Sequence, residues 1–521
     1  MLSDETDIDA MLEAFEQEER RRLGLAEVEP HQWRDPNPQR FTRAQRSATT
    51  ILFGGLTRGQ DQLISAALAG LGYKIEALDV PDNEAFRVGK EFGNRAQCNP
   101  TYFTVGNLLK YLANLRDEQG LSVQQIIDEY IFLTPGACGP CRFGTYPTEF
   151  RKALRDAGFK NFRVMIFQQQ GGLIQAVGTE LGLTLNPRFF VALLKAIIAG
   201  DVLNLVGYRL RPYECNQGAT DAAIDACKEV LDKALRERSS FVRALRHCRR
   251  VLNIVEVDRL QPKPKVSVIG EFWAMTTEGD GNYRLQRFLE SEGAEVDIQT
   301  VTAWVLYNIW EHRFDTKRRM SLQGADAEGQ GLYGTNPKAK IAMLWLAEQA
   351  LRRWFALYAR LIGLRRYPLP DMDELAAISH PYYDNHLRGG EGHMEVGKVI
   401  EAVDQRKAHM VVSVKPFGCM PSSGVSDGVQ SIVTAKYPEA IFCAIETTGD
   451  GAVSAQSRVQ MGLFKAKKAA AREHEHALAL AGLTQVEAEA KLRGSRSART
   501  LYYPRHVSAG TAANHVLEMT P

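Results

Sequence analysis

Short apolar runs alternate with segments of helical spacing along most of this chain, and no other feature constrains its fold as strongly. Strands separated by helices of about 10–15 residues are typical of βαβ units in a parallel sheet. The pattern runs through the first half and restarts after a break that contains two prolines. The expected strands are residues 49–53, 74–80, 130–133, 164–167, 266–269, 294–298, 410–414 and 440–445. The sequence therefore predicts an α/β fold of two facing Rossmann-like or flavodoxin-like lobes with parallel sheets and additional helices.

Changes in composition divide the chain into four expected parts. They are a polar N-terminal helical extension (1–45), a first α/β lobe with a helical insert (46–262), a second α/β lobe (263–465), and a C-terminal helix with a tail (466–521). Residues 219–255 or so contain no strong breaker and are expected to be helical, and the last 25 residues or so are expected to be irregular. Ligands of open α/β sheets bind beyond the carboxyl ends of the strands, so two facing lobes would place a site in the cleft between them.

Composition narrows the class of protein. Apolar residues make up 45% of the chain and charged residues 24%, which is ordinary for a soluble globular protein. A net charge of +2 favours neither nucleic acid nor membrane lipid as a partner. The best apolar stretch, residues 189–199, contains Lys195 and falls short of the roughly 20 residues that span a membrane. The N-terminus is acidic and has no apolar signal region, so the cytoplasm is the expected compartment.

Four of the eight cysteines lie in loops rich in glycine and proline: Cys98, Cys138, Cys141 and Cys419. Cytoplasmic thiols stay reduced, so metal binding or redox chemistry is more plausible than disulfides. Cys98 precedes an expected helix, whose dipole would lower the thiol pKa. The pair in TPGACGPC and the cysteine in KPFGCMPS each follow an apolar strand. Because strand ends present ligands in α/β folds, these loops are expected to form one site.

Several chemistries fit these cysteines. Glycine lets backbone amides approach a sulfide and proline fixes the loop, which is the setting that an iron–sulfur cubane needs. A lone CxxC would also suit a redox pair or half of a zinc site. The chain has no second CxxC for a four-thiolate zinc site. Cys227, Cys248 and Cys443 are expected to be ordinary helix or strand residues, and Cys215 is undecided.

Longer stretches around the cysteines resemble the 2-hydroxyacyl-CoA dehydratase and benzoyl-CoA reductase component family, in particular its branch related to acyl-CoA dehydratase activases. They include CNPTYFTVGNLLKYL, GPCRFGTY and KPFGCMPS, and the resemblance extends from about residue 50 to 465. It implies two facing α/β lobes with a [4Fe–4S] cluster in the cleft, held by Cys98, Cys141 and Cys419. Cys138 would be a fourth ligand, a ligand of a larger double cluster, or a bystander.

The resemblance also implies a chemistry and partners. A separate activator protein with an actin-like ATPase fold would inject a low-potential electron. That electron reduces the thioester carbonyl of a 2-hydroxyacyl-CoA to a ketyl radical, which expels the hydroxyl group. This chain has neither a P-loop nor the acidic–glycine phosphate signature of actin-like ATPases, so no ATP site is expected in it. A related dehydratase subunit or a homodimer would complete the enzyme.

Two other readings remain open. One is an electron-transfer or accessory protein of the same family that has no acyl-CoA substrate. The other is a zinc-stabilised or metal-free interaction protein. Metal content separates the second of these from the iron–sulfur readings, and acyl-CoA binding separates an enzyme from an accessory protein.

Residues outside the cysteine loops carry weaker signals, and none is assigned as general acid or base. Arg142 would bind a CoA phosphate, tune the cluster or form a surface salt bridge. His380, His386 and His393 lack the spacing of a zinc helix motif and indicate a loop that lines a cleft. Glu391 and Glu395 would be acid–base groups or solvated carboxylates at a helix start. Gly54 and Gly55 would face a phosphate or form a tight turn.

Overall fold

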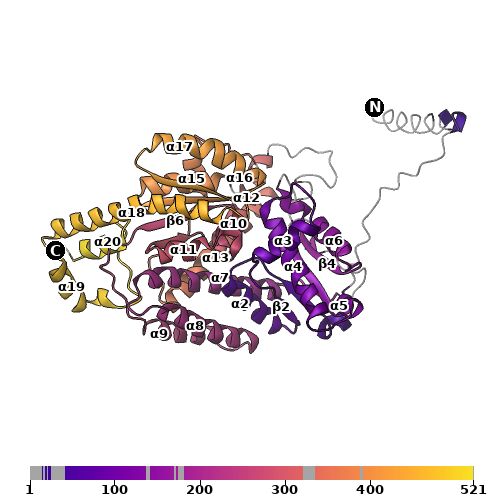
Figure 1. Cartoon of the computed structure of the whole chain (residues 1–521), viewed down its shortest axis with the longest axis horizontal. Helices are drawn as coiled ribbons and strands as arrows, with labels where there is room; N and C mark the ends of the chain where they lie inside the picture. The colour runs from indigo at the N-terminus through magenta and orange to yellow at the C-terminus, as the bar shows by residue number, and fades with distance from the viewer. Residues whose placement is uncertain are drawn as a thin grey trace. The chain divides into compact units, whose positions relative to one another are not determined.

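Two β-sheets organise the structure, a computed structural model, and they confirm the predicted α/β fold with two lobes (Figure 1). The structure describes residues 15, 18–19, 21–24, 41–136, 141–168, 172–173, 181–320, 332, 335–387, 390 and 392–519. Contacts divide the chain into an N-terminal unit, Met1–Pro38, and a larger unit, Gln39–Pro521, that holds both sheets. In the N-terminal unit, the described residues 18–19 and 21–22 are helical and Phe15 is exposed.

The first sheet has the strand order β2-β1-β3-β4-β5, in which four strands are parallel and a two-residue edge strand is antiparallel. Its strands are β1 (Thr50–Phe53), β2 (Ile75–Ala77), β3 (Tyr130–Gly136), β4 (Arg163–Gln168) and β5 (Gly172–Leu173). The helices of this lobe are η1 (Arg43–Ser47), α2 (Arg58–Ala69), α3 (Asn83–Phe92), α4 (Asn99–Asp117), α5 (Val123–Glu129), η2 (Arg142–Thr145) and α6 (Tyr146–Asp156). Ile51 and Leu52 of β1 point to opposite faces and both are buried, because helices cover the sheet on both sides.

The second sheet has the order β7-β6-β8-β9, and all its strands are parallel. Its strands are β6 (Lys265–Gly270), β7 (Glu295–Ile298), β8 (Met410–Pro416) and β9 (Ile441–Thr447). Its helices are α10 (Phe272–Thr276), η4 (Asp280–Asn282), α11 (Leu285–Ser291), α12 (Val301–Arg319), α13 (Pro337–Ile362), α14 (Met372–Ser379), α15 (Gly392–Asp404), α16 (Met420–Gly424), η6 (Val425–Val429), α17 (Gln430–Lys436), α18 (Ala452–Ala481), α19 (Gln485–Arg493), η7 (Arg496–Ala498) and α20 (Thr511–Leu517). Every residue of the central strand β8 is buried.

A group of helices joins the two lobes. It comprises α7 (Pro187–Leu210), η3 (Arg211–Tyr213), α8 (Ala219–Arg236) and α9 (Phe241–Leu252). Helix α7 packs on α2 of the first lobe and on β7, α12 and α13 of the second. One hydrophobic core consequently runs from Ile51 in β1 to Val412 in β8.

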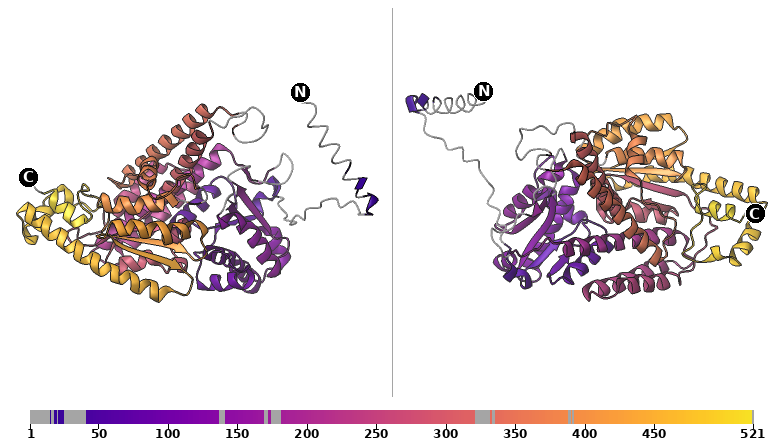
Figure 2. Two further views of the ribbon diagram at one scale, coloured as in Figure 1. Left: turned by 90° about the horizontal axis from the view of Figure 1, so that it is seen from above. Right: turned by 180° about the vertical axis from the view of Figure 1, so that it is seen from behind.

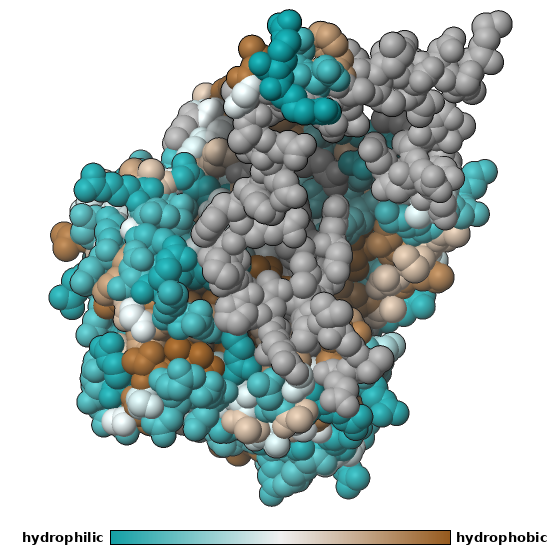
Figure 3. Space-filling view, turned by 90° about the vertical axis from the view of Figure 1, so that its right-hand side faces the viewer, coloured by the Kyte–Doolittle hydropathy of each residue, from teal (hydrophilic) through white to brown (hydrophobic). Residues whose placement is uncertain are grey.

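Helix α7 is longer than the apolar stretch recognised in the sequence. Together with η3 it forms a segment of 27 residues that is long and apolar enough to cross a membrane. However, 61% of its most apolar window is buried inside the protein, as expected for the core helix of a soluble protein. The described residues on the face drawn in Figure 3 are mostly hydrophilic, with apolar patches among them.

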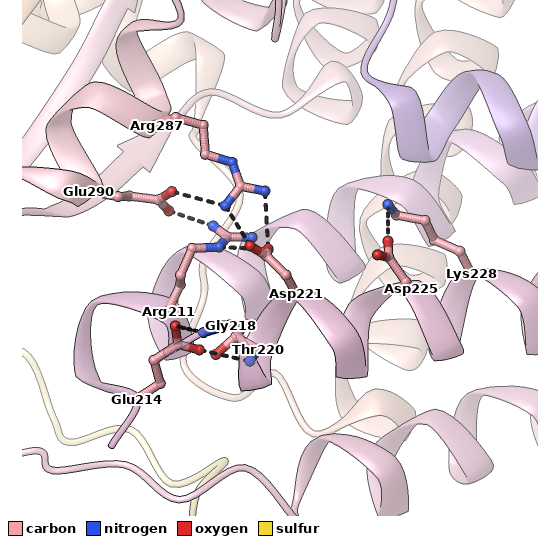
Figure 4. Close-up of polar contacts among 9 residues, drawn as sticks. All are labelled: Arg211, Glu214, Gly218, Thr220, Asp221, Asp225, Lys228, Arg287 and Glu290. Carbon is pink, nitrogen blue, oxygen red and sulfur yellow. Dashed lines mark hydrogen bonds and ion pairs between the residues drawn. The ribbon is translucent and has the colours of Figure 1, made fainter. Parts of the chain in front are cut away.

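A network of four charged side chains ties the connecting helices to the second lobe (Figure 4). Arg211 of η3 donates to Asp221 of α8 at 2.9 Å and to Glu290 of α11 at 2.6 Å. Arg287 of α11 reaches back to Asp221 with two bonds of 3.0 and 3.1 Å. Both carboxylates are shared by two guanidinium groups, so the network fixes α11 against the start of α8.

Two helical expectations need correction. The region 219–255 is not one helix, because Arg238 adopts the left-handed conformation (φ +52°) between α8 and α9. The last 25 residues are not an irregular tail. Residues Thr511–Leu517 form α20, which packs on α18 and is buried over most of its length.

The carboxylate of Asp201, in the middle of α7, holds three helices together. Its oxygens accept hydrogen bonds from the Gln60 amide of α2 at 2.8 Å and from the N–H groups of Val301 and Thr302 at 3.0 and 2.7 Å. The Thr302 hydroxyl donates as well, at 2.5 Å. The two N–H groups belong to the first turn of α12, which has no intrahelical acceptors. Asp201 therefore links the first lobe to the second through one buried group.

We expect Asp201→Ala to lower the free energy of unfolding by about 3 kcal/mol or more, because four buried donors lose their acceptor. Chemical denaturation followed by circular dichroism measures the change. Asp225→Ala is the matched control, since Asp225 is exposed and pairs with Lys228 on the same helix (Figure 4). Its effect should stay within about 0.5 kcal/mol. Equal stabilities for the two variants would contradict the linking role of Asp201.

Candidate functional site

The strand order of each sheet reverses between two central strands, β1 and β3 in the first sheet and β6 and β8 in the second. The loops that follow such a pair diverge to opposite faces, and ligands of open α/β sheets bind in the crevice between them. Cys141 follows β3 and Cys419 follows β8. Two of the predicted ligands therefore lie at topological switch points.

The loop of Cys419 contacts the start of α4, where Cys98 is the N-cap residue. The N–H of Asn99 donates to the Phe417 carbonyl at 2.9 Å. Gly418 has a φ of +76°, and a Cβ at this position would lie 3.2 Å from Cα of Cys98. Glycine is suited both to this left-handed conformation and to this close approach. The structure thus brings together one predicted ligand from each lobe.

The Cys98 thiol is buried among polar groups of the first lobe. Its sulfur lies 3.2 Å from the Thr101 hydroxyl and 3.1 Å from the Tyr146 hydroxyl. Burial raises the pKa of Cys98, the hydrogen bonds with Thr101 and Tyr146 lower it, and the Glu271 carboxylate raises it. The expected lowering of this pKa by the α4 dipole is wrong, because burial outweighs the N-terminal position.

Cys419, the N-cap residue of α16, is buried as well. Burial raises the pKa of Cys419 well above its usual value and the Glu271 carboxylate raises it further, while hydrogen bonds with Ser422 lower it. The Ser422 hydroxyl donates to Glu395 Oε1 at 2.9 Å. Glu395 is a buried residue of α15, so it is not the solvated carboxylate considered from the sequence. Glu391 lies outside the described residues.

Glu271 is a carboxylate that acts on both thiols. It follows Gly270, the last residue of β6, and accepts hydrogen bonds from the N–H groups of Trp273 and Ala274 at 3.1 and 2.8 Å. Burial raises the pKa of Glu271, and these hydrogen bonds lower it. The sequence reasoning did not identify Glu271, although a polar residue directly after a strand at a switch point is a signal that could have found it.

Cys141 is half-buried and precedes η2. The Arg142 guanidinium donates to the carbonyl of Ala96, two residues before Cys98. Tyr146, five residues after Cys141, reaches the sulfur of Cys98. These two contacts hold the chain after Cys141 against the Cys98 loop. Within the described residues, the contact of Arg142 is with the backbone carbonyl of Ala96, so the three roles considered for Arg142 from the sequence stay predictions.

Cys98, Cys141 and Cys419 fit an iron–sulfur cluster in ligand type. The loops that carry Cys98 and Cys419 come from opposite lobes and contact each other, and the chain after Cys141 contacts the Cys98 loop. Asn99 Nδ2 and Arg142 Nε are buried donors without a hydrogen-bond partner among the described residues. Inorganic sulfide accepts hydrogen bonds of this kind.

The predicted ligand set is not complete among the residues described. Cys138 lies outside them. In the part of the chain that the structure describes, no group of three His, Cys, Asp or Glu side chains has the arrangement of a metal site. Cys98 and Cys419 are therefore the two predicted ligands whose loops contact each other across the lobes, and the residue after Cys141 contacts the Cys98 loop.

The three histidines do not form a common site. His393 of α15 packs against Tyr307 and Trp310, with ring centroids 5.2 and 4.4 Å away. Burial lowers the pKa of His393 to about 4, so its imidazole is neutral at pH 7. His380 and His386 are exposed. Only His393 has the burial expected of a residue in a cleft.

Three other cysteines, Cys227, Cys248 and Cys443, lie in helices or a strand as the sequence predicts, and the structure places Cys215, which the sequence left undecided. Cys227 of α8 and Cys248 of α9 are buried, and the sulfur of each lies 3.7 Å from the backbone oxygen of the other. Cys443 is buried in β9, and Cys215 is exposed after η3.

The turn after β1 contacts a buried acid, Asp61, in the first turn of α2. Gly55 has a φ of +117°, and its N–H donates to Asp61 Oδ2 at 3.3 Å. Asp61 Oδ1 is buried and has no partner among the described residues. Burial raises the pKa of Asp61 to about 7. The Arg58 N–H at the start of α2 donates to Glu278 at 2.7 Å, so a carboxylate occupies the place that a phosphate would take.

No protein-family model matches the chain and no curated protein matches it. The geometry of the cysteine loops, together with the resemblance of the motifs around them, therefore carries the functional argument.

The raised pKa of Asp61 predicts a stability that depends on pH. The folded protein keeps this proton up to about pH 7, whereas the unfolded chain releases it near pH 3.8. Stability therefore falls as pH rises from about 4 to 7 and levels off above that. Asp61→Asn removes this dependence, so the unfolding free energy of the wild type relative to the variant should decline by a few kcal/mol from pH 5 to pH 8.

Denaturation curves at pH 5, 6, 7 and 8 for both proteins give this difference. Asp225→Asn serves as the control, because Asp225 is an exposed aspartate and its replacement should leave the pH profile of the wild type unchanged. A pH-independent difference between the wild type and Asp61→Asn would show that Asp61 is ionised in the folded protein.

Proposed function

We propose that this chain is the [4Fe–4S] component of an ATP-dependent system of the 2-hydroxyacyl-CoA dehydratase type. The meeting of the Cys98 and Cys419 loops carries the proposal. A backbone hydrogen bond and the close approach of Gly418 hold these loops from two lobes together. A fold that only needed buried thiols would not require such a contact between the loop before α4 in one lobe and the loop after β8 in the other.

Cys98, Cys141 and Cys419 would hold the cluster, with Cys138 as a fourth ligand or as a ligand of a double cluster. When bound, the cluster would supply a low-potential electron and an iron site open to a substrate oxygen. The side chains around it have separate roles. Glu271 places negative charge beside the thiols, Ser422 hydrogen-bonds near Cys419, and the buried donors of Asn99 and Arg142 would satisfy sulfide.

The proposed reaction needs partners outside this chain. A separate activator with an actin-like ATPase fold would deliver the electron, because the sequence has no ATP-binding motif. The substrate would be an acyl-CoA thioester, and a related subunit or a second copy would complete the enzyme. The net charge of +2 gives no reason to propose nucleic acid or a membrane as partner, and we place the protein in the cytoplasm.

An accessory iron–sulfur protein without an acyl-CoA substrate is the second candidate. It is favoured by the state of two titratable groups of the described residues. His393 is neutral and packs against Tyr307 and Trp310, and Glu271 accepts hydrogen bonds from the first turn of α10, so neither is a free general acid or base.

The first test is the iron, sulfide and zinc content of the anaerobically purified protein, with electron paramagnetic resonance after reduction by dithionite. A [4Fe–4S] cluster gives about four iron and four sulfide per chain, and a double cluster about eight iron. Cys98→Ser and Cys419→Ser should lower the iron content to less than about a tenth of the wild type, because each removes a ligand that the fold holds in place.

Cys215→Ser and Cys443→Ser are the controls, since one residue is exposed and the other lies within β9. Both should keep the wild-type iron content. Zinc alone, or iron content that is unaffected by Cys98→Ser and Cys419→Ser, would overturn the proposal. Binding of an acyl-CoA, measured by calorimetry, then separates the dehydratase from the accessory protein.

Glu271→Gln should keep the cluster and make its reduction potential more positive at pH 8. Removing a nearby negative charge favours the added electron, by on the order of 50 mV, which corresponds to about 1 kcal/mol for one electron. A redox titration followed by paramagnetic resonance measures the shift. Glu439→Gln, an exposed position before β9, should leave the potential unchanged. An equal potential in wild type and Glu271→Gln would exclude Glu271 from the surroundings of the cluster.

A further inference from the structure

A cavity of about 220 Å³ is lined by arginine and tyrosine side chains. We call it the arginine pocket, and its lining residues are Arg365, Arg366, Arg496, Ser497, Tyr502 and Tyr503. They come from the loop after α13, from η7 and from the segment before α20. None of these residues belongs to the cysteine loops, so the pocket is a separate feature of the structure.

The arginine pocket lies at the amino edge of the second sheet. The Tyr503 hydroxyl donates to Oε1 of Glu295, the first residue of β7, at 2.7 Å. Nζ of Lys265, the first residue of β6, donates to the Tyr503 hydroxyl at 3.2 Å. Cys419 follows the opposite, carboxyl edge of the same sheet. Figures 1 and 2 show the yellow C-terminal segment on the side of the second lobe that faces away from the purple first lobe.

Positive charge around the pocket exceeds negative charge. Arg366 pairs with Glu518 at 2.6 Å, but within the described part of the chain the side chains of Arg365 and Arg496 have no carboxylate partner. Arg259, which is 3% exposed, donates to the carbonyls of Arg209 and of Thr500, two residues before Tyr502. Its positive charge adds to that of the pocket, although the buried Glu295 carboxylate attracts it.

Arg366 and the two tyrosines of the pocket are held in place before any ligand binds, whereas Arg365 and Arg496 are exposed side chains at its rim. Arg366 donates to the Tyr503 carbonyl at 3.1 Å, and the Tyr502 hydroxyl donates to Glu518 at 2.5 Å. The Arg209 guanidinium stacks 3.6 Å from the centre of the Tyr503 ring. Arg366 itself has a φ of +55°, a strained conformation for this residue, and such strain concentrates at ligand sites. Groups fixed in this way lose little entropy when they bind an anion.

We propose that the arginine pocket binds a phosphate group, carried by a phosphate ester or by a diphosphate. Guanidinium groups present planar, paired N–H donors that match phosphate oxygens, and several phosphate oxygens can be shared among two unpaired arginines and the Ser497 hydroxyl. A single carboxylate would satisfy one guanidinium and leave the other unpaired. Tyr502 and Tyr503 also line the pocket, and their rings offer apolar surface on which the organic part of an ester would pack.

The test is calorimetric titration of the full-length, anaerobically purified protein with inorganic pyrophosphate, inorganic phosphate and ADP in turn. Sodium chloride of equal ionic strength corrects for screening. We expect saturable binding of at least one of these anions. The double variant Arg365→Gln/Arg496→Gln should bind at least about tenfold more weakly, because two charge-assisted contacts are lost.

Arg493→Gln is the matched control, since Arg493 is an exposed arginine of α19 three residues before Arg496 and pairs with Glu489. It carries the same change of charge outside the pocket and should bind like the wild type. The circular dichroism spectrum of each variant shows whether it is folded. This test does not depend on the metal content of the protein, so its outcome is separate from that of the proposed function.

The relative affinities identify the source of the phosphate. Tighter binding of ADP than of pyrophosphate would point to a nucleotide ester, and the reverse order to an inorganic anion, and either result supports the pocket. The proposal is overturned if no anion binds at concentrations up to about 10 mM. It is equally overturned if the double variant binds as tightly as Arg493→Gln.

Discussion

The carboxylate of Asp201 is the interaction on which the arrangement of the two lobes depends. Asp201 lies in α7, a helix that is long and apolar enough to cross a membrane. In such apolar surroundings a buried charge is costly unless hydrogen-bond donors surround it. Gln60 supplies one donor from the first lobe, and the first turn of α12 supplies the others from the second. Four donors to one carboxylate hold α7 in a fixed position between the two sheets.

The position of α7 between the lobes determines how closely the cysteine loops approach each other. The hydrogen bond between Asn99 and Phe417 joins two segments that share no secondary structure, and a small rotation of either lobe would break it. Gly418 tolerates no side chain without displacing the backbone at Cys98. A contact this close requires lobes that do not slide, and the shared core around α7 provides that rigidity. The position of the thiols is thus a consequence of packing far from them.

The sequence predicted those features that depend on local pattern. Apolar runs such as residues 410–414 identified the strands, and the position of the cysteines after strands identified the switch-point loops. Helix α20 was missed because its buried residues are small or polar, as in Thr511, Ala513 and Asn514, and show no apolar periodicity. The end of α8 was missed because Arg238, and not glycine or proline, adopts the left-handed conformation there.

Contacts between residues far apart in the sequence could not be predicted from local pattern either. Tyr146 contacts the sulfur of Cys98 over 48 residues, and Ser422 contacts Glu395 over 27. No spacing rule encodes such pairs, because both members lie on separate elements whose contact exists only after the lobes have formed. The same limit applies to the arginine pocket, whose lining residues belong to three segments.

The two edges of the second sheet differ in charge, and the C-terminal segment is the reason. At the carboxyl edge, buried thiols lie near Glu271, which opposes their ionisation. At the amino edge, Glu295 accepts hydrogen bonds from Tyr213, Tyr503 and Thr511. Burial opposes ionisation of Glu295, but Lys265 and these hydroxyls lower its pKa. Its negative charge is thus used within the protein, and among the described residues Arg365 and Arg496 of the pocket have no carboxylate partner. A cation at the carboxyl edge and an anion at the amino edge would each balance the charge of the side chains at that edge.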